Sequence, residues 1–186
     1  MEKISRRRAI EKTSTIMCGA LSSSLVLGVL SGCRADIDLD WTPQAFTNVE
    51  AMIVADFAEQ VLPTTDTPGA KEAGVESFVE KMVAEYLSNK EQEVFRNGLS
   101  WLQERKFHTA TPEIQYNMMM ELAEQARMEK QQRDAKPFFL LAKEMILLGF
   151  FTSEIGATQV LNYDPIPGIY QGCKPLEEVG GKTWAS

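Results

Sequence analysis

Residues 137–151 read PFFLLAKEMILLGFF, and this stretch is apolar on nearly every side of a helix. Lys143 and Glu144 are its only charged residues. A helix that is apolar all round belongs in a protein interior, because none of its faces suits contact with water. The sequence therefore predicts a central, most buried helix here, with the other helices packed around it.

Four amphipathic helices are predicted before this stretch. Thr42 and Pro43 have the residue types of an N-cap and a first helical position, so a helix is expected to begin there and to end at Pro63. The others are expected after Gly74, near Asn89 and at residues 111–112. The residues predicted to face the core recur every three or four positions: Phe46, Val49, Ile53, Phe57 and Val61; Phe78, Val79, Met82, Val83, Tyr86 and Leu87; Val94, Phe95, Leu99 and Leu102; Ile114, Met118, Leu122 and Ala126.

Two details of these helices predict close packing. Gly98 lies inside a predicted helix, where glycine is less favourable than alanine by about 1 kcal/mol unless a neighbouring helix packs closely against it. The run Met118-Met119-Met120 is expected to be core with one exposed member rather than a metal site.

The fold class predicted is all-α, a single domain of about five helices over residues 42–152. Residues 153–186 are predicted to be an irregular segment, because the run NYDPIPGIY at 162–170 holds two prolines and a glycine. This tail is nevertheless rich in Tyr and Ile. It either folds back over its own core or wraps a partner, and Trp184 near the end favours the partner.

The first 32 residues are interpreted as an export signal that is removed. The apolar run 16–30 is too short to span a bilayer and is interrupted by Gly and Ser. Arg7 and Arg8 resemble the twin-arginine signal, whose pathway exports folded proteins; the alternative is an ordinary positively charged leader. Residues 30–33, Leu-Ser-Gly-Cys, resemble a bacterial lipoprotein box, so Cys33 is predicted to carry lipid and residues 33–41 to form a lipid-anchored tether.

Cleavage before Cys33 leaves 154 of the 186 residues, with 14 basic and 24 acidic side chains and a net charge of −10. This charge argues against nucleic acid as a partner and against electrostatic binding to anionic lipid. Cys173 is then the one cysteine without a predicted role. It is either a buried free thiol or half of an intermolecular bridge.

No catalytic constellation is recognisable, so no catalysis by this chain alone is expected, and neither a metal nor a cofactor is predicted in it. His108 is the single histidine, and it is expected to be solvated. Gly-x-Ser-x-Gly, Gly-x-Gly-x-x-Gly and phosphate-loop motifs are missing from the sequence.

Two stretches carry a resemblance to a known family. The loop LPTTDTPGA at 62–70, followed by Ala-Gly-Val at 73–75, and the run FFTSEIG at 150–156 are similar to the gluconate 2-dehydrogenase subunit 3 family. The similarity extends roughly from Pro43 to Pro175. This family supplies the small subunit of membrane-associated sugar and polyol dehydrogenases.

The resemblance implies a helical, non-catalytic accessory subunit. Its partner would be a large subunit of the glucose-methanol-choline oxidoreductase type, which binds FAD, oxidises the sugar and is carried out of the cell by the small subunit's signal. Many family members depend on a cytochrome subunit for membrane attachment, whereas Cys33 would anchor this one. The acceptor, a cytochrome c or another electron carrier, is therefore left open. So is the inner or outer membrane, although the periplasmic side is expected.

On this interpretation two segments contact the large subunit. They comprise the loop residues Asp66, Thr67, Pro68 and Gly69 and the tail residues Tyr163, Pro165, Pro167 and Tyr170. Cys173 is predicted to form an intersubunit disulfide. The alternative function is a stand-alone helical lipoprotein that binds a small ligand between its helices, which a deep apolar pocket near residues 137–151 would favour.

Overall fold

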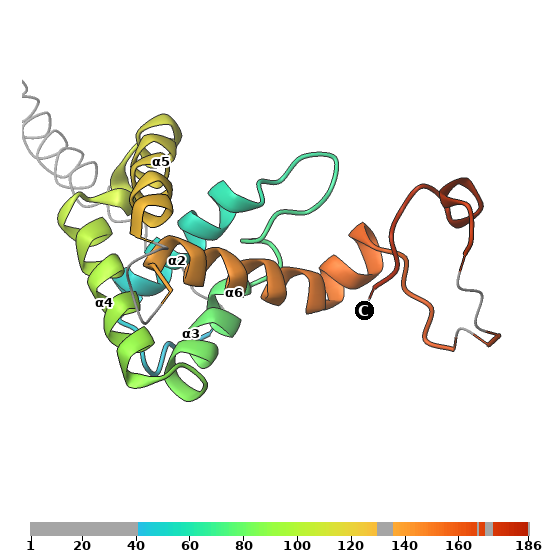
Figure 1. The fold of residues 1–186 in the computed structure, drawn as a ribbon, viewed down its shortest axis with the longest axis horizontal. Helices are drawn as coiled ribbons and strands as arrows, with labels where there is room; N and C mark the ends of the chain where they lie inside the picture. The colour runs from blue at the N-terminus through green and yellow to red at the C-terminus, as the bar shows by residue number, and fades with distance from the viewer. Residues whose placement is uncertain (1–40, 130–135, 167, 170–172, 186) are drawn as a thin grey trace, which may run out of the picture. The chain divides into compact units, whose positions relative to one another are not determined.

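The computed structural model describes residues 41–129, 136–166, 168–169 and 173–185. In these residues the chain forms five α-helices (Figure 1): α2 (Asn48–Val61), α3 (Val75–Glu85), α4 (Asn89–Glu104), α5 (Pro112–Glu129) and α6 (Phe138–Thr152). Three short helical turns accompany them: η1 (Phe107–Thr109), η2 (Gly156–Val160) and η3 (Leu176–Val179). The described part contains no β-strand, only one isolated bridge between Asn162 and Trp184. The predicted all-α fold is confirmed. The predicted roles of Arg7, Arg8 and Cys33 concern residues outside the described ranges.

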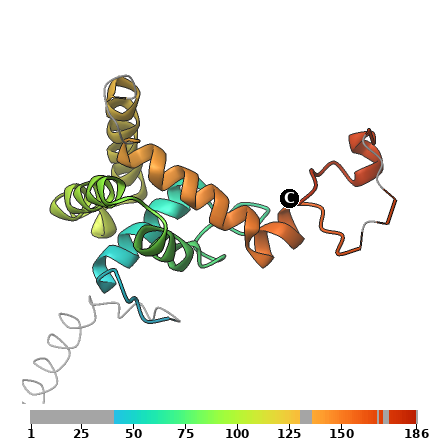
Figure 2. The same cartoon turned by 60° about the horizontal axis from the view of Figure 1, so that its bottom comes forward.

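Helix α6 is the centre of the domain, as its composition predicts. It contacts each of the other four α-helices, and Figures 1 and 2 show it running from the α5 side of the domain past α3. Seven of its residues are buried: Phe138, Leu141, Ala142, Met145, Ile146, Gly149 and Phe150. Lys143 and Glu144 are exposed. The four surrounding helices each bury one apolar face against it, which is how an all-round apolar helix is kept from water.

A group of phenylalanines joins α6 to α2 and α4. The ring centroid of Phe57 lies 5.8 Å from that of Phe138, and the ring of Phe95 lies 5.2 Å from Phe138. Gly98 of α4 makes this approach possible, because a Cβ atom built on it would lie only 2.1 Å from Cγ of Phe138. The predicted close packing at Gly98 is confirmed.

The predicted start of the first helix is wrong. Helix α2 begins at Asn48 with Thr47 as its N-cap, five residues after Thr42. Thr47 and Glu50 form a capping box, in which the Glu50 carboxylate accepts the Thr47 N–H at 2.7 Å and the Thr47 hydroxyl accepts the Glu50 N–H at 3.2 Å. Residues 44–46 bend before the helix, and their N–H groups bond to another helix.

A single buried carboxylate on α3 accepts these N–H groups. Oε1 of Glu80 accepts the backbone N–H groups of Gln44, Ala45 and Phe46 at 2.8, 2.7 and 2.8 Å. Glu80 is only 7% exposed. These three bonds fasten residues 44–46 to α3 and give each of these backbone N–H groups an acceptor outside a helix.

Most residues predicted to face the core are buried, including Ile53, Phe57, Val79, Val83, Leu122 and Ala126, but three are exposed. Val49, Tyr86 and Ile114 were expected to face the core but are 40%, 68% and 48% exposed. On α5 the buried residues are Gln115, Met119, Leu122 and Ala126, because the Gln115 carboxamide is itself held inside the fold. Tyr86 lies at the C-cap of α3, beyond the part that packs. The methionine run is predicted correctly, since Met119 is 6% exposed and Met120 is 52% exposed.

Glu76, one turn before Glu80, is a buried carboxylate that lacks a full set of partners. It is 7% exposed, and its Oε2 and the nearby Nε1 of Trp41 are both buried with no hydrogen-bond partner among the described residues. Burial raises the pKa of Glu76 above its ordinary value, although its own backbone N–H, the Trp41 indole and Lys71 act in the opposite direction.

We expect Glu76→Gln to make the protein more stable at neutral pH. The raised pKa means that the folded state binds the Glu76 proton more tightly than the unfolded chain does. The stability that protonated Glu76 contributes is therefore complete below the unfolded pKa of about 4.3 and is lost as pH rises through the folded pKa. Thermal unfolding measured from pH 4 to pH 8 should show the variant above wild type at pH 7 and the two converging towards pH 4. A constant difference across this range would contradict the prediction.

Candidate partner-binding surface

The loop between α2 and α3, residues 62–74, is organised by Glu59. The Glu59 carboxylate accepts the backbone N–H of Thr64 at 2.8 Å through Oε1 and that of Lys71 at 3.2 Å through Oε2. The loop is closed at its base by the Ala70 N–H, which donates to the Leu62 carbonyl at 2.9 Å. Because three hydrogen bonds fix its base and sides, this loop has a defined shape before it meets any partner.

The loop residues predicted to contact a partner differ in exposure. Asp66 is exposed, Thr67 and Pro68 are half-buried, and Gly69 is buried. A Cβ atom on Gly69 would lie 2.5 Å from Oγ1 and 2.6 Å from N of Thr64. The loop closes so tightly here that only glycine fits. Gly69 thus supports the loop, whereas the exposed tip that a partner can reach is residues 64–66.

Asp56 joins this loop to η1 through a cluster that the sequence did not reveal. Nδ1 of His108 lies 2.6 Å from Oδ2 of Asp56, and Nζ of Lys71 lies 2.9 Å from Oδ1. The His108 side chain is 23% exposed and that of Asp56 is 14% exposed. The expectation that His108 is simply solvated is therefore wrong. Asp56 and His108 are 52 residues apart, and no local spacing relates them.

The end of the tail returns to its start after α6 and η2 (Figure 1), and hydrogen bonds join the two there. The Asn162 side-chain amide donates to the carbonyls of Val179 at 2.5 Å and Lys182 at 2.8 Å. The Asn162 backbone N–H donates to the Thr183 carbonyl at 2.7 Å, and its carbonyl accepts the Ala185 N–H at 2.8 Å. We call the described residues of this segment, 162–166, 168–169 and 173–185, the closed tail.

The large apolar side chains described in the closed tail are exposed rather than packed. The exposed fractions are 58% for Tyr163, 83% for Ile166, 88% for Ile169, 55% for Leu176 and 50% for Trp184. These residues therefore do not fold back over the core, which was one of the two alternatives for the tail. Exposed apolar groups gathered in one segment are typical of interaction sites.

The remaining predicted tail residues are placed as follows. Pro165 is exposed. Pro167 and Tyr170 lie outside the described residues. Cys173 is a free, exposed thiol, so the buried-thiol alternative is wrong. Its exposure leaves it accessible to a partner.

The loop 62–74 and the start of the tail lie at the same end of the helical domain. Gly149, near the end of α6, packs so closely on the first turns of α3 that a Cβ atom there would lie 2.6 Å from Phe78 and 3.2 Å from Val75. Helix α3 starts where the loop ends, and η2 and the tail follow α6. The packing of α6 on α3 thus brings the exit of the loop and the entry of the tail together, although they are about 75 residues apart.

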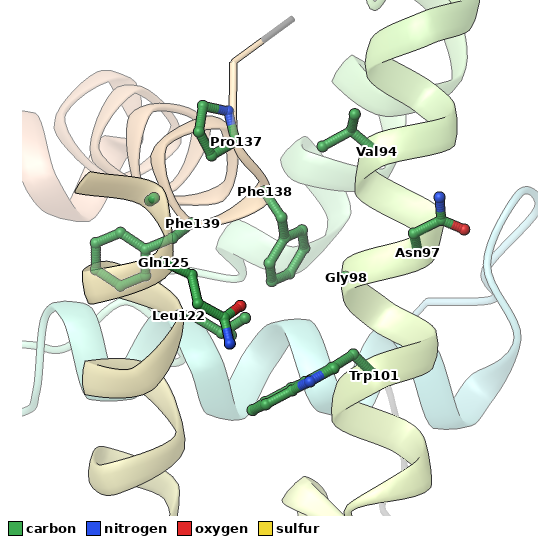
Figure 3. A pocket seen from close by; sticks show the side chains of 10 residues that line it. Val94, Asn97, Gly98, Trp101, Leu122, Gln125, Pro137, Phe138 and Phe139 are labelled. Atoms are coloured by element: carbon green, nitrogen blue, oxygen red, sulfur yellow. The ribbon is translucent and has the colours of Figure 1, made fainter. Parts of the chain in front are cut away.

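An open cleft of about 320 Å³ lies between α4, α5 and the start of α6. Trp101, Phe138 and Phe139 contribute its aromatic lining, and Gln125 contributes a carboxamide. Figure 3 shows the Trp101 ring reaching from α4 towards α5, below Phe138, with the Asn97 amide turned away from the cleft. The cleft lies beside α6, but it is open and has a mixed polar and apolar lining, unlike the deep apolar pocket that the small-ligand alternative expected.

The described residues also bear on metal binding and on membrane insertion. Within the residues that the structure describes, no three His, Cys, Asp or Glu side chains are grouped so that they could hold a metal ion. None of the described helices has both the length and the apolar character needed to cross a membrane.

Comparison with known proteins decides the family. The family model described as gluconate 2-dehydrogenase subunit 3 matches residues 48–168, which is more than half of the chain. This chain belongs to the gluconate 2-dehydrogenase subunit 3 family. It is thus the small accessory subunit of a dehydrogenase complex, and its partners are dehydrogenase subunits. No curated protein and no solved structure matched the chain.

The matched region contains the features that carried the resemblance in the sequence. It includes the loop 62–74 and residues 150–156, and it ends at Gly168 inside the closed tail. The resemblance to the subunit 3 family is confirmed over a shorter range than Pro43 to Pro175. Cys173 and Trp184 lie beyond the match.

Proposed function

We propose that this protein is the non-catalytic small subunit of a periplasmic, membrane-associated sugar dehydrogenase, and that it escorts and anchors an FAD-dependent large subunit of the glucose-methanol-choline type. Family membership over residues 48–168 is the observation that carries the proposal. The end of the domain that combines loop 62–74 with the closed tail supplies an exposed surface for the large subunit.

The leader supports the escort role. Arg7 and Arg8 resemble a signal for the export of folded proteins. A flavoprotein needs its fold to hold FAD, so a large subunit without its own leader would have to cross the membrane folded and bound to a subunit that has one.

The anchor in this proposal is lipid on Cys33. Each buried CH₂ group of an acyl chain contributes about 0.8 kcal/mol, so two or more chains on one cysteine hold a protein firmly at a membrane. The net charge of −10 beyond the leader gives no electrostatic attraction to anionic lipid. Attachment through Cys33 would therefore be independent of ionic strength.

The test is affinity purification of the full-length protein from its native membrane in mild detergent, followed by an absorbance scan. We expect a large subunit to co-purify with a flavin spectrum and with sugar-dependent dye reduction. A single chain without flavin, obtained from membranes that retain sugar dehydrogenase activity, would overturn the proposal. Cys33→Ser should move the complex from the membrane fraction to the soluble fraction if lipid on this residue is the anchor.

Cys173 is proposed to form a disulfide with a cysteine of the large subunit, since its thiol is exposed in the closed tail. Non-reducing electrophoresis of the native complex should show one joined band that separates with reductant, and Cys173→Ser should abolish that band. Separate bands without reductant, after alkylation of free thiols during lysis, would exclude the bridge.

The cleft between α4, α5 and α6 favours a second candidate, a lipoprotein that binds a small, largely apolar ligand. Trp101 lines the cleft, so its fluorescence should change on binding. A panel of sugars, aromatic acids and quinone analogues that leaves the fluorescence unchanged, while the flavoprotein co-purifies, would decide against this candidate.

A further inference from the structure

We propose that the closed tail is a preformed docking element for the dehydrogenase subunit, and that Asn162 is the positioning residue that holds it in its binding shape. The proposal rests on the proposed function for the identity of the partner. Its own evidence is the pattern of hydrogen bonds and exposure in residues 162–185.

Asn162 joins the two ends of the closed tail through both its main-chain groups and its side-chain amide. Its side chain donates to carbonyls 17 and 20 residues ahead, those of Val179 and Lys182. Asn is suited to this role because its amide carries two N–H donors that can reach two carbonyls at once. Lys182 adds a further closure, since its Nζ donates to the Gln159 carbonyl at 2.6 Å.

The local sequence is shaped to present those carbonyls. Gly180 and Gly181 have φ values of 72° and 76°, a region that favours glycine, and they turn the chain directly after η3. The Gly181 N–H donates to the Leu176 carbonyl at 2.9 Å, which completes the turn. The turn leaves the Val179 and Lys182 carbonyls facing Asn162 on either side of the two glycines.

The closed tail thus has polar closure but leaves its large apolar side chains in water. Ile166 and Ile169 are the two most exposed large apolar residues described in the chain, at 83% and 88%. A segment that evolves only to be solvated has no use for isoleucine at these positions, whereas burial against a partner recovers about 25 cal/mol for each Å² removed from water. Exposure and closure together indicate an element ordered in advance for binding.

The occupant that we assign is the apolar surface of a dehydrogenase subunit. The family to which the chain belongs implies partnership with such subunits, and its match includes the first part of the closed tail, up to Gly168, with Tyr163 and Ile166. The described charges of the closed tail nearly cancel, since Asp164, Glu177 and Glu178 oppose Lys174 and Lys182. Apolar contact, rather than charge, is therefore expected to supply the affinity. Preformation lowers the ordering entropy that binding would otherwise cost.

Asn162→Asp tests the positioning role. The substitution keeps the size of the side chain but replaces the amide donors with oxygens that face two carbonyls, so the tail should open. Asn117→Asp, on the exposed surface of α5, is the matched control for the same chemical change. Hydrogen exchange of the full chain should rise in residues 162–185 for Asn162→Asp only. The Tm of the helical domain should change no more in this variant than in the control.

Affinity for the purified flavoprotein subunit is the second readout. We expect Asn162→Asp to weaken binding at least about tenfold, which corresponds to about 1.4 kcal/mol, and Asn117→Asp to leave it unchanged. The double variant Ile166→Ser/Ile169→Ser should weaken binding by a similar factor without raising hydrogen exchange at Asn162, because it removes the contact side chains and keeps the closure.

The outcomes separate this proposal from the function on which it rests. If wild type does not bind the flavoprotein, the proposed function fails. If wild type binds and the Asn162 and isoleucine variants bind equally well, the docking role of the closed tail is overturned while the proposed function stands. If the isoleucine variant loses binding to phosphatidylethanolamine–phosphatidylglycerol vesicles and keeps flavoprotein binding, the closed tail contacts lipid and the proposal is equally overturned.

Discussion

Gly98→Val is expected to lower the free energy of unfolding by about 3 kcal/mol. A Cβ atom at position 98 would lie 2.1 Å from Cγ of Phe138, and this carbon is at the fixed base of the ring rather than at a flexible end. Phe138 cannot move without losing its contacts with Phe57 and Phe95, whose centroids lie 5.8 and 5.2 Å away. Overpacking a tight core costs typically about 1–3 kcal/mol, and each lost aromatic pair about 0.5–1.5 kcal/mol.

Ser100→Val is the matched control, because Ser100 is exposed on the same helix and has no steric conflict. Urea unfolding should show a change below about 0.5 kcal/mol for this control, as is usual at exposed positions. Phe138→Leu, added to Gly98→Val, should cost less than the sum of the two single changes, since the smaller side chain relieves the overlap. Equal stability of Gly98→Val and Ser100→Val would refute the close helix contact.

Glu80→Ala should lower the free energy of unfolding by about 3 kcal/mol as well. The carboxylate accepts three N–H groups at 2.7–2.8 Å, and hydrogen bonds to charged groups contribute about 1.5–3 kcal/mol each. The total is smaller than three times that value because the N–H groups of Gln44 and Ala45 are only partly buried and can turn to water. The Phe46 N–H, in contrast, would be left buried and unpaired.

Two further variants, Glu80→Gln and Glu85→Ala, separate the loss of the three hydrogen bonds to residues 44–46 from the loss of a charge. A glutamine side chain keeps one oxygen acceptor, so Glu80→Gln should cost about 1 kcal/mol, and Glu85→Ala, which removes an exposed carboxylate from the same helix, should cost less than about 0.5 kcal/mol. Hydrogen exchange of the amides of residues 44–46 should rise in the order wild type, Glu80→Gln, Glu80→Ala. Unchanged exchange in Glu80→Ala would show that other contacts hold this segment.

The two residues differ in how far the sequence indicates their role. Gly98 is visible in the sequence as a costly residue inside a helix, which is explained if a neighbouring helix packs closely there. Glu80 is one carboxylate among many, and the sequence places it on an amphipathic helix without indicating that it faces inward. Its three donors come from a segment 34–36 residues away, which bends instead of forming the first turn of a helix, so α2 begins at Asn48 and not at Pro43.

Some features of the candidate surface are also recognisable in the sequence, whereas others are not. The loop 62–70 and the Tyr- and Ile-rich tail are recognisable in the sequence, and both are exposed at least in part. The buried, supporting role of Gly69 and the closure of the tail by Asn162 are not recognisable, because they depend on contacts with Thr64, Val179 and Lys182 in the folded chain.

The sequence by itself determined the all-α class, the existence of the five helices and the central place of α6, because these depend on apolar spacing and breakers within one segment. The tertiary structure alone decided that Val49, Tyr86 and Ile114 are exposed and that Gln115 is buried, and it paired Asp56 with His108, Glu80 with residues 44–46 and Asn162 with the end of the tail. Apolar spacing selects the face of a helix that turns inward, but packing against elements distant in the chain decides which residues at the edges and ends of that face are covered. Polar bonds across 17 to 52 residues form only after that choice, so no local pattern announces them.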